Sequence, residues 1–357
     1  MESKLIVIAI GGNSLIEDPK NVTVKSQYEA ADKTAKHIAK LVQAGNRVVI
    51  AHGNGPQVGY ILRRAEIAST QLHTVPLDSC VADTQGAIGY QLQMALDNQM
   101  AMDGIKKNIA TVVTQVEVKG DDPSFQKPTK PIGSFMTEEV AMEKRDKDGW
   151  NVVEDAGRGW RRVVASPKPV SIIELETIRC LLDNGVIVIA AGGGGIPVVK
   201  DENGILHGKE AVIDKDLAAA MLAKDLKADL FVISTAVPKV CINFGKPNEK
   251  KLDSITTEEA KKYMGEGHFA PGSMLPKIQA IVDFVDSTGN VGIVTDPEHL
   301  YEAVYGEQGT KIEGCSLSVR ICHISLPSKE GAFFTGPSFW KEEVKLPALT
   351  DRASGQE

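Results

Sequence analysis

Strand-like and helix-like patterns of apolar residues alternate along this chain from Leu5 to Tyr305. Unbroken apolar runs of strand length occupy residues 5–10, 47–52 and 186–191. Between such runs, apolar residues recur at helical spacing, as in the segments 26–44 and 77–102. This alternation is typical of an α/β fold, in which helices cover both faces of a mostly parallel sheet.

Capping and turn residues predict where several further elements begin. Asn54, followed by Pro56, predicts the start of a helix. Ser171 and Glu174 have the spacing of a capping box, which predicts a helix leading to Gly185. One long strand is expected over 109–118. The remaining strands are expected at 229–234, 239–243 and 291–295, and the remaining helices at 256–264, 274–286 and 298–305.

Three of the predicted strands run directly into glycine-rich turns. The turns are Gly11-Gly12-Asn13, Gly53-Asn54-Gly55 and the glycine run 192–195. Glycine allows positive φ and lets a ligand approach the backbone closely. A strand, a glycine turn and a helix in succession form an anion site from backbone N–H groups. Three such turns predict a ligand with several phosphate or carboxylate groups at one edge of the sheet.

Two common phosphate-binding motifs are excluded by counting. The pair Gly53 and Gly55 is followed by Gly59, one residue too late for G-x-G-x-x-G, and the run 192–195 leads into Pro197. A Walker A motif needs Gly-Lys before Ser or Thr. The two Gly-Lys pairs, at 208–209 and 245–246, instead precede glutamate and proline.

Two segments depart from the alternation. Residues 119–169 contain several prolines, many charges and two of the three tryptophans, which predicts a protruding subdomain; we call this segment the lid. Residues 314–357 read as an extension of unknown role, partly disordered at its end.

Composition narrows the class of protein. The net charge of −7 argues against a nucleic-acid binder, and the 42% hydrophobic and 24% charged content is that of an ordinary globular protein. Five cysteines without a C-x-x-C pair indicate reduced thiols and no zinc site. Residues 1–4 lead straight into the first strand, and no apolar run is long enough to span a membrane. We therefore expect a cytoplasmic protein.

The sharpest local signal is Asp214-Lys215-Asp216, which predicts a helix start capped by Asp214. A helix N-terminus already carries positive charge, so a lysine in the first turn is disfavoured unless an anion binds there. Lys215 is therefore a candidate ligand of an anion. A solvated first turn with a local Lys215–Asp216 pair would have the same sequence.

Two more lysines lie beside unusual turns. Lys277 follows Gly272 and Ser273 at the start of a predicted helix. Lys130 lies in the lid between Pro128 and Pro131, which hold the backbone extended. Either lysine could be a solvated surface charge; alternatively, Lys130 captures an anion when the lid closes.

The predicted chemistry is phosphoryl transfer. The seven histidines form neither a Ser-His-Asp arrangement nor a metal-ligand spacing. Phosphoryl transfer needs no covalent residue, because positioning and charge neutralisation do most of the work.

Together these segments resemble the amino-acid-kinase superfamily and, within it, the carbamate kinases. The resemblance covers residues from about 4 to 312 and is most specific at 127–133 and 154–161. The other matching segments are 9–13, 52–59, 85–90, 192–197, 212–218, 240–247 and 268–277.

The resemblance implies a three-layer αβα sandwich with an open, mainly parallel sheet of about eight strands and a protruding lid subdomain. It implies a domain over 1–313, with an acceptor half at about 1–184 and a nucleotide half at about 185–313. The implied enzyme is a homodimeric phosphotransferase with a carboxyl group as acceptor. It transfers phosphoryl reversibly between carbamoyl phosphate and ADP, with Mg²⁺ carried by the nucleotide and no direct metal ligand. In arginine fermentation this reaction runs toward ATP, ammonia and carbon dioxide.

The resemblance also implies roles for individual residues. Lys215 and Lys277 stabilise the transferring phosphoryl group, Lys130 closes over it, and Asp216 orients the first two lysines. Carbamate and the phosphoryl group are held by Gly11, Gly12, Asn13, Gly53 and Asn54, while Gly193, Gly194 and Gly195 lie against the nucleotide or the acceptor. The nucleotide is held by Thr235, Ala236, Val237, Val240, Phe244, Ala270, Pro271, Gly272, Ser273 and Met274.

Two rival functions remain at this stage. Relatives that phosphorylate amino-acid carboxylates usually carry a lysine just before the first double glycine, where this chain has Ile8-Ala9-Ile10. An acylglutamate or aspartate kinase is therefore disfavoured, and Lys130 would supply the missing charge. A catalytically idle nucleotide sensor is disfavoured because Lys215, Asp216 and Lys277 are all present.

Overall fold

In the computed structural model, residues 3–11, 15, 23–155, 157 and 159–314 are described. Their main sheet has eight strands, and the two at one edge, β15 and β17, run opposite to the other six. Across the sheet the strands are β15 (Ser254–Thr256), β17 (Thr310–Glu313), β16 (Val291–Thr295), β12 (Leu230–Ser234), β1 (Leu5–Ile10), β2 (Arg47–His52), β9 (Ile187–Ile189) and β3 (Ile109–Thr111). The expected mainly parallel sheet is confirmed.

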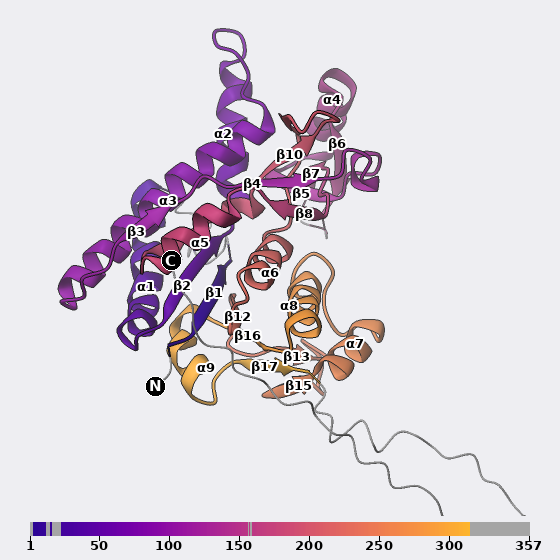
Figure 1. Cartoon of the computed structure of the whole chain (residues 1–357). Coiled ribbons are helices and arrows are strands. Elements are labelled where there is room, and N and C mark those ends of the chain that lie inside the picture. Colours follow the sequence, from indigo (N-terminus) through magenta and orange to yellow (C-terminus); the bar gives the residue numbers. More distant parts are fainter. Residues whose placement is uncertain (1–2, 12–14, 16–22, 156, 158, 315–357) are drawn as a thin grey trace, which may run out of the picture. The chain divides into compact units, whose positions relative to one another are not determined.

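Helices cover both faces of this sheet (Figure 1). Every residue of β1 is buried, because alternate side chains enter two different cores. One face packs against α1 (Val24–Gln43), α3 (Leu77–Met102) and α9 (Leu300–Tyr305). The other packs against α5 (Leu175–Asp183), α6 (Lys215–Asp225), α7 (Thr257–Gly265) and α8 (Met274–Thr288). The αβα sandwich explains why the central strands read as unbroken apolar runs.

The sheet order brings the three glycine turns together. Strands β1, β2 and β9 are parallel neighbours, and Gly11, Gly53 and the turn η3 (Gly192–Gly194) lie beyond their carboxyl ends. Helix α2 (Gly55–Ala68) begins directly after the second turn. The prediction that the three turns share one edge of the sheet is confirmed.

The lid segment contains a small sheet of its own. Its antiparallel strands are β5 (Lys130–Met136), β7 (Trp160–Val164) and β6 (Asn151–Glu154), accompanied by η2 (Pro123–Phe125) and α4 (Glu138–Asp148). A second sheet joins β11 (Leu206–Gly208), β10 (Ile196–Lys200), β4 (Gln115–Val118) and β8 (Pro169–Ile172). Gly59 of α2 faces Gly133 of β5 so closely that a Cβ on Gly59 would collide with the Gly133 backbone.

The expected strand over 109–118 is wrong, because it is two strands in two sheets. Strand β3 ends at Thr111, and β4 begins at Gln115 in the second sheet. Between them Thr114 is held by a side chain: its N–H donates to Gln85 Oε1 at 2.8 Å, and its carbonyl accepts from Gln85 Nε2 at 3.1 Å. The Thr114 carbonyl also accepts from the Ile196 N–H at 2.9 Å, so a side chain and the second sheet together hold the point where the chain changes sheets.

The predicted capping box at 171–174 is also wrong. Ser171 lies in β8 and its hydroxyl donates to Glu117 at 2.7 Å. Glu174 precedes α5, and its carboxylate accepts from the N–H and the side-chain amide of Gln115. Both side chains therefore tie β8 and α5 to β4 rather than capping a helix.

The remaining predicted elements differ less. The strand expected over 239–243 is reduced to β13 (Cys241–Ile242), which pairs with β14 (Lys250–Lys251), and the helix expected at 298–305 starts with η4 (Pro297–His299) before α9. No helix in the described part of the chain is both long and apolar enough to cross a bilayer. Residues 315–357, like Gly12 and Asn13, lie outside the described residues.

Candidate active site

A pocket of about 290 Å³ lies at the carboxyl edge of the main sheet. Residues from all three glycine turns contribute to it, together with the three candidate lysines. The predicted site residues that line it are Gly11, Gly53, Asn54, Lys130, Gly193, Lys215, Thr235, Ala236, Gly272, Ser273 and Lys277. Segments more than 200 residues apart in sequence, such as Gly11 and Lys277, thereby meet in one place.

Three helices begin at this pocket. Helices α2, α6 and α8 start at Gly55, Lys215 and Met274, and the pocket is lined by Gly55, Lys215 and Ser273. The first amides of a helix lack partners within the helix, and its dipole adds positive potential there. Three such ends and three lysines give this pocket a positive potential that favours an anion.

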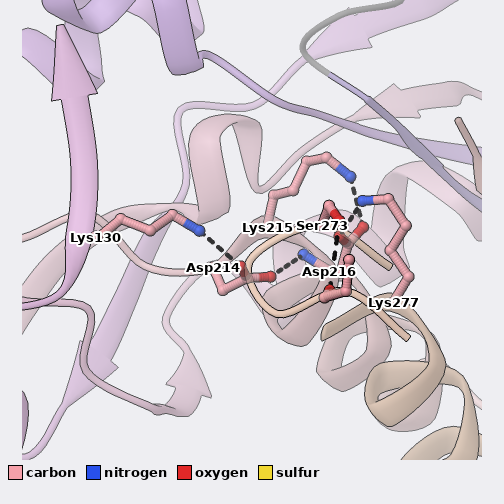
Figure 2. Close-up of polar contacts among 7 residues, drawn as sticks. Lys130, Asp214, Lys215, Asp216, Ser273 and Lys277 are labelled. Atoms are coloured by element: carbon pink, nitrogen blue, oxygen red, sulfur yellow. Dashed lines mark hydrogen bonds and ion pairs between the residues drawn. The ribbon is translucent and has the colours of Figure 1, made fainter. Parts of the chain in front are cut away.

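Lys215 and Lys277 share one carboxylate. Lys215 Nζ donates to Asp216 Oδ1 at 2.5 Å, and Lys277 Nζ donates to Asp216 Oδ2 at 2.8 Å (Figure 2). The Asp216 side chain is only 4% exposed. Burial alone would raise the pKa of this carboxyl, but the two ammonium groups outweigh it and lower the pKa to about 2. Asp216 is therefore ionised, and its two oxygens each accept from one of the lysines.

Burial and the neighbouring Lys277 lower the pKa of Lys215, although its ion pair with Asp216 acts in the opposite direction. The pKa of Lys215 thus falls despite the salt bridge, because taking an ammonium out of water costs more than one partner returns. An added anion would restore that lost stabilisation. The electrostatics of Lys215 therefore favour an added negative charge beside it.

Lys130 reaches the same region from the lid. It is the first residue of β5, and its Nζ donates to Asp214 Oδ2 at 2.6 Å. Asp214 caps α6, accepting from the N–H of Asp216 at 2.9 Å. Figure 2 shows Lys130 approaching Asp214 from one side while Lys215 and Lys277 meet at Asp216 on the other. The predicted helix start at Asp214 is confirmed.

The first two glycine turns are built differently from expectation. The N–H of Gly11 donates to Ser234 O and the N–H of Gly53 donates to Ile10 O, each at 3.0 Å, so both amides belong to the sheet. The Asn54 side chain does not cap α2; its Nδ2 donates to Thr84 Oγ1 at 2.9 Å. Among the described residues of these two turns, the first amides of α2 remain as backbone donors for a ligand.

Positive φ angles and close neighbours explain why the third turn consists of glycines. Gly193, Gly194 and Gly195 all have positive φ, and a Cβ at these positions would collide with Asn54, the Ile213 carbonyl and Val116, respectively. Only Gly193 of the three lines the pocket. Packing alone therefore accounts for Gly194 and Gly195, whose predicted ligand contacts remain predictions.

The predicted nucleotide residues are spread more widely. Thr235, Ala236, Gly272 and Ser273 line the pocket. Val240 is fully buried in the core, whereas the Phe244 side chain is 70% exposed. The residues predicted for the nucleotide that do not line the pocket are Val237, Val240, Phe244, Ala270, Pro271 and Met274.

The segments that carry the family resemblance include Gln85 and His52, but the sequence analysis gave neither residue a role. Gln85 Nε2 donates to the carbonyl of Gly192 at 2.9 Å, which ties α3 to the third turn. His52 is fully buried beside Gly192, and burial lowers its pKa to about 4, so it is neutral at pH 7. Asp214 was identified only as a cap. Polar residues on an otherwise buried helix face or strand were the available signal for Gln85 and His52.

Comparison with known proteins gives a consistent result. A model of the amino acid kinase family matches residues 4–296. The carbamate kinase of Clostridium perfringens is 51% identical over 312 residues, covering 86% of this chain and 99% of that protein. The carbamate kinase-like protein YahI of Escherichia coli is 50% identical over 313 residues, covering 87% and 98%.

Solved structures agree with the sequence matches. Carbamate kinase from Giardia lamblia bound to AMP-PNP superposes with a TM-score of 0.82 at 42% identity, covering 87% of this chain and 99% of that chain. An N-acetylglutamate synthase from Neisseria gonorrhoeae matches with a TM-score of 0.53 at 16% identity, covering 88% and 60%. The second likeness shows the fold alone.

Proposed function

Because the chain belongs to the amino acid kinase family, and within it to the carbamate kinases and carbamate kinase-like proteins, we propose that it transfers a phosphoryl group reversibly between carbamoyl phosphate and ADP. The observation that carries this proposal is the meeting of Lys130, Lys215 and Lys277 at three helix N-termini. That arrangement suits a group whose negative charge spreads over several oxygens during transfer.

The proposed mechanism is electrostatic. Lys215 and Lys277, both anchored on Asp216, stabilise the equatorial oxygens of the phosphoryl group as it moves between the two acceptor oxygens. Carbamate attacks through an oxygen that is already anionic, so no general base is required. Asp216 forms two ion pairs, and its pKa is lowered to about 2. It is therefore suited to orienting the two lysines and not to accepting a proton.

We propose that the nucleotide half of the pocket is the side bounded by Thr235, Ala236, Gly272 and Ser273. The carbamate side is then bounded by Gly11, Gly53, Asn54 and the first amides of α2, with Lys130 above it. The lack of a lysine before Gly11 supports carbamate over an amino-acid carboxylate as acceptor.

Mg²⁺ enters this proposal as part of the nucleotide substrate. Among the described residues, no group of three or more His, Cys, Asp or Glu side chains could hold a metal ion. Asp214 and Asp216, the carboxylates nearest the lysines, are both engaged in ion pairs. These residues fit a metal coordinated by phosphate oxygens, where it would neutralise charge and orient the nucleotide.

The setting of this activity follows from the family resemblance given by the sequence. We propose a cytoplasmic homodimer that acts in arginine catabolism, where carbamoyl phosphate is converted to ATP, ammonia and carbon dioxide.

A coupled assay tests the proposal. The protein should form ATP from ADP and carbamoyl phosphate in the presence of Mg²⁺, should lose this activity when EDTA is added, and should not phosphorylate acetylglutamate or aspartate. Robust activity on either amino acid with none on carbamoyl phosphate would falsify the proposal. ADP binding without turnover of any substrate would instead indicate an idle nucleotide sensor.

A further inference from the structure

Asp214 makes two contacts that serve different parts of the molecule. Its Oδ1 accepts from the N–H of Asp216 and so fixes the first turn of α6. Its Oδ2 accepts from Lys130 Nζ at 2.6 Å and so reaches the lid. One carboxylate therefore joins the helix that carries Lys215 and Asp216 to the strand that carries Lys130.

The capping role alone does not require a carboxylate. Asn or Ser caps a helix about as well as Asp does. A negative charge at this position also weakens the site for its substrate, because it lies beside a pocket that must hold an anion. The charge of Asp214 is needed for one of its two contacts, the ion pair with Lys130.

Lys130 and Asp214 are both partly exposed, so a ligand oxygen can replace the Asp214 oxygen on the Lys130 ammonium. The Lys130 side chain is 32% exposed and lines the pocket, and the Asp214 side chain is 17% exposed. By contrast, Asp216 is 4% exposed between two lysines that are 13% and 14% exposed. A phosphate oxygen arriving in the pocket can replace a carboxylate oxygen on the Lys130 ammonium, with little disturbance of Asp216.

We propose, building on the function above, that Asp214 is a positioning residue that holds Lys130 over the empty site and releases it to the phosphoryl group when substrate binds. In the resting enzyme the ion pair keeps the start of β5 against α6. When the substrate arrives, Lys130 moves a short distance to a phosphate oxygen, and Asp214 keeps the α6 cap. The lid lysine is thus oriented before the substrate enters.

Asp214→Asn separates the two contacts, because the amide oxygen still caps α6 while the charge is lost. In the ATP-forming assay, kcat should fall by about tenfold, since Lys130 is no longer preoriented. The KM for carbamoyl phosphate should be equal to or below that of wild type, since one repelling charge is removed. A merely structural defect would not produce this split. A loss that appears as a raised KM with kcat within about twofold of wild type would overturn the proposal.

A double mutant decides whether Asp214 acts through Lys130. In a Lys130→Ala background, adding Asp214→Asn should change kcat by less than about twofold. If Asp214→Asn costs as much there as in the wild type, the two residues act separately and the proposal fails. Asp122→Asn is the matched control, because Asp122 is also an aspartate N-cap that accepts from Ser124 N–H. Its second oxygen accepts from the backbone N–H of Lys168 instead of a lysine ammonium, and it does not line the pocket.

Hydrogen exchange on the full-length protein tests the Lys130–Asp214 ion pair without any catalytic turnover. In the absence of substrate, Asp214→Asn should speed exchange in β5 and β7, and Lys130→Ala should speed it to a similar extent. Adding carbamoyl phosphate alone should restore protection in Asp214→Asn but not in Lys130→Ala. Unchanged exchange in both variants would overturn the proposal. Because this readout needs no catalysis, it stays informative even if the coupled assay rejects the proposed function.

Discussion

The pocket holds its lysines in two different ways. Lys215 and Lys277 project from packed helices, are 13% and 14% exposed, and share the buried Asp216. Lys130 projects from a strand of the lid, is 32% exposed, and has a more exposed partner, Asp214. The three lysines are therefore held in two ways. The first pair is preorganised by the core, whereas the third lysine can change partner.

This contrast follows from the elements that carry the lysines. Helices α6 and α8 bury apolar residues in the same core cluster, so their first turns cannot separate without exposing it. Strand β5 belongs to a separate three-stranded sheet. Rigid charges reduce the reorganisation required during transfer, while a charge on a movable segment can admit substrate and then exclude water.

The largest effect should come from removing the shared anchor. Asp216→Asn leaves two largely buried ammonium groups close together without the carboxylate that they share, which should cost about 3–5 kcal/mol of unfolding free energy. The kcat/KM for carbamoyl phosphate should fall by more than about 10³. Urea unfolding and the ATP-forming assay measure these two effects.

Asp286→Asn is the control for that experiment, because Asp286 pairs with Lys261 in a surface ion pair whose side chains are 40% and 52% exposed. It should cost less than about 1 kcal/mol and leave activity unchanged. Equal stability losses in the two variants would mean that the Asp216 cluster is no more preorganised than a surface pair.

Lys130→Ala should have the next largest effect. Removing one oriented charge should lower kcat/KM for carbamoyl phosphate by about 10²–10³. ADP affinity and Tm should stay nearly unchanged, because the ion pair with Asp214 is partly exposed. Lys147→Ala, which removes a lid lysine that is 72% exposed, is the control. Activity of Lys130→Ala within about threefold of wild type would show that Lys130 is only a solvated loop charge.

Burial of the His52 side chain should make the free energy of unfolding depend on pH. His52 has a folded pKa of about 4 because it is fully buried, below its ordinary value of 6.5. The folded state therefore resists protonation, so the contribution of His52 is complete above pH 6.5 and is lost as the pH falls toward 4. The loss should reach about 3 kcal/mol.

Urea unfolding between pH 7 and pH 4 measures this slope. His52→Gln should flatten most of it, with a remainder from His37, whose pKa is also lowered by burial. Asp216 should not contribute in this window, because its pKa of about 2 places its loss of stability below pH 4. An unchanged slope in His52→Gln would show that water reaches the His52 side chain in spite of its burial.

The smallest effect should come from the C-terminal extension. A chain that ends at Gly314 keeps β17, the last strand of the main sheet, and should stay soluble. Its kcat/KM should remain within about twofold of that of the full chain, because all three lysines and their anchors are retained. Insolubility or lost activity on truncation would show that residues 315–357 support the core.

The sequence predicted the parts of the site that are local. A strand followed by glycines, or a lysine after a capping aspartate, is visible within a few residues, and so the three turns, Lys215 and Lys277 were found. Partnerships between distant segments were not predictable: nothing near Asp214 indicates Lys130, 84 residues away. The split of 109–118 likewise depends on Gln85, a helix residue 29 positions upstream.

The close contact between the facing glycines of α2 and β5 fixes how far apart these two elements lie beside the pocket. Gly59 lies one turn beyond the start of α2, and Gly133 lies three residues beyond Lys130. Because no side chain separates them, the position of Lys130 at the start of β5 depends directly on the first turns of α2. A single methyl group at residue 59 would push β5 away from α2 without altering any residue that lines the pocket. The close contact depends on the missing Cβ of Gly59, whereas Gly133 is required for its positive φ of 71°.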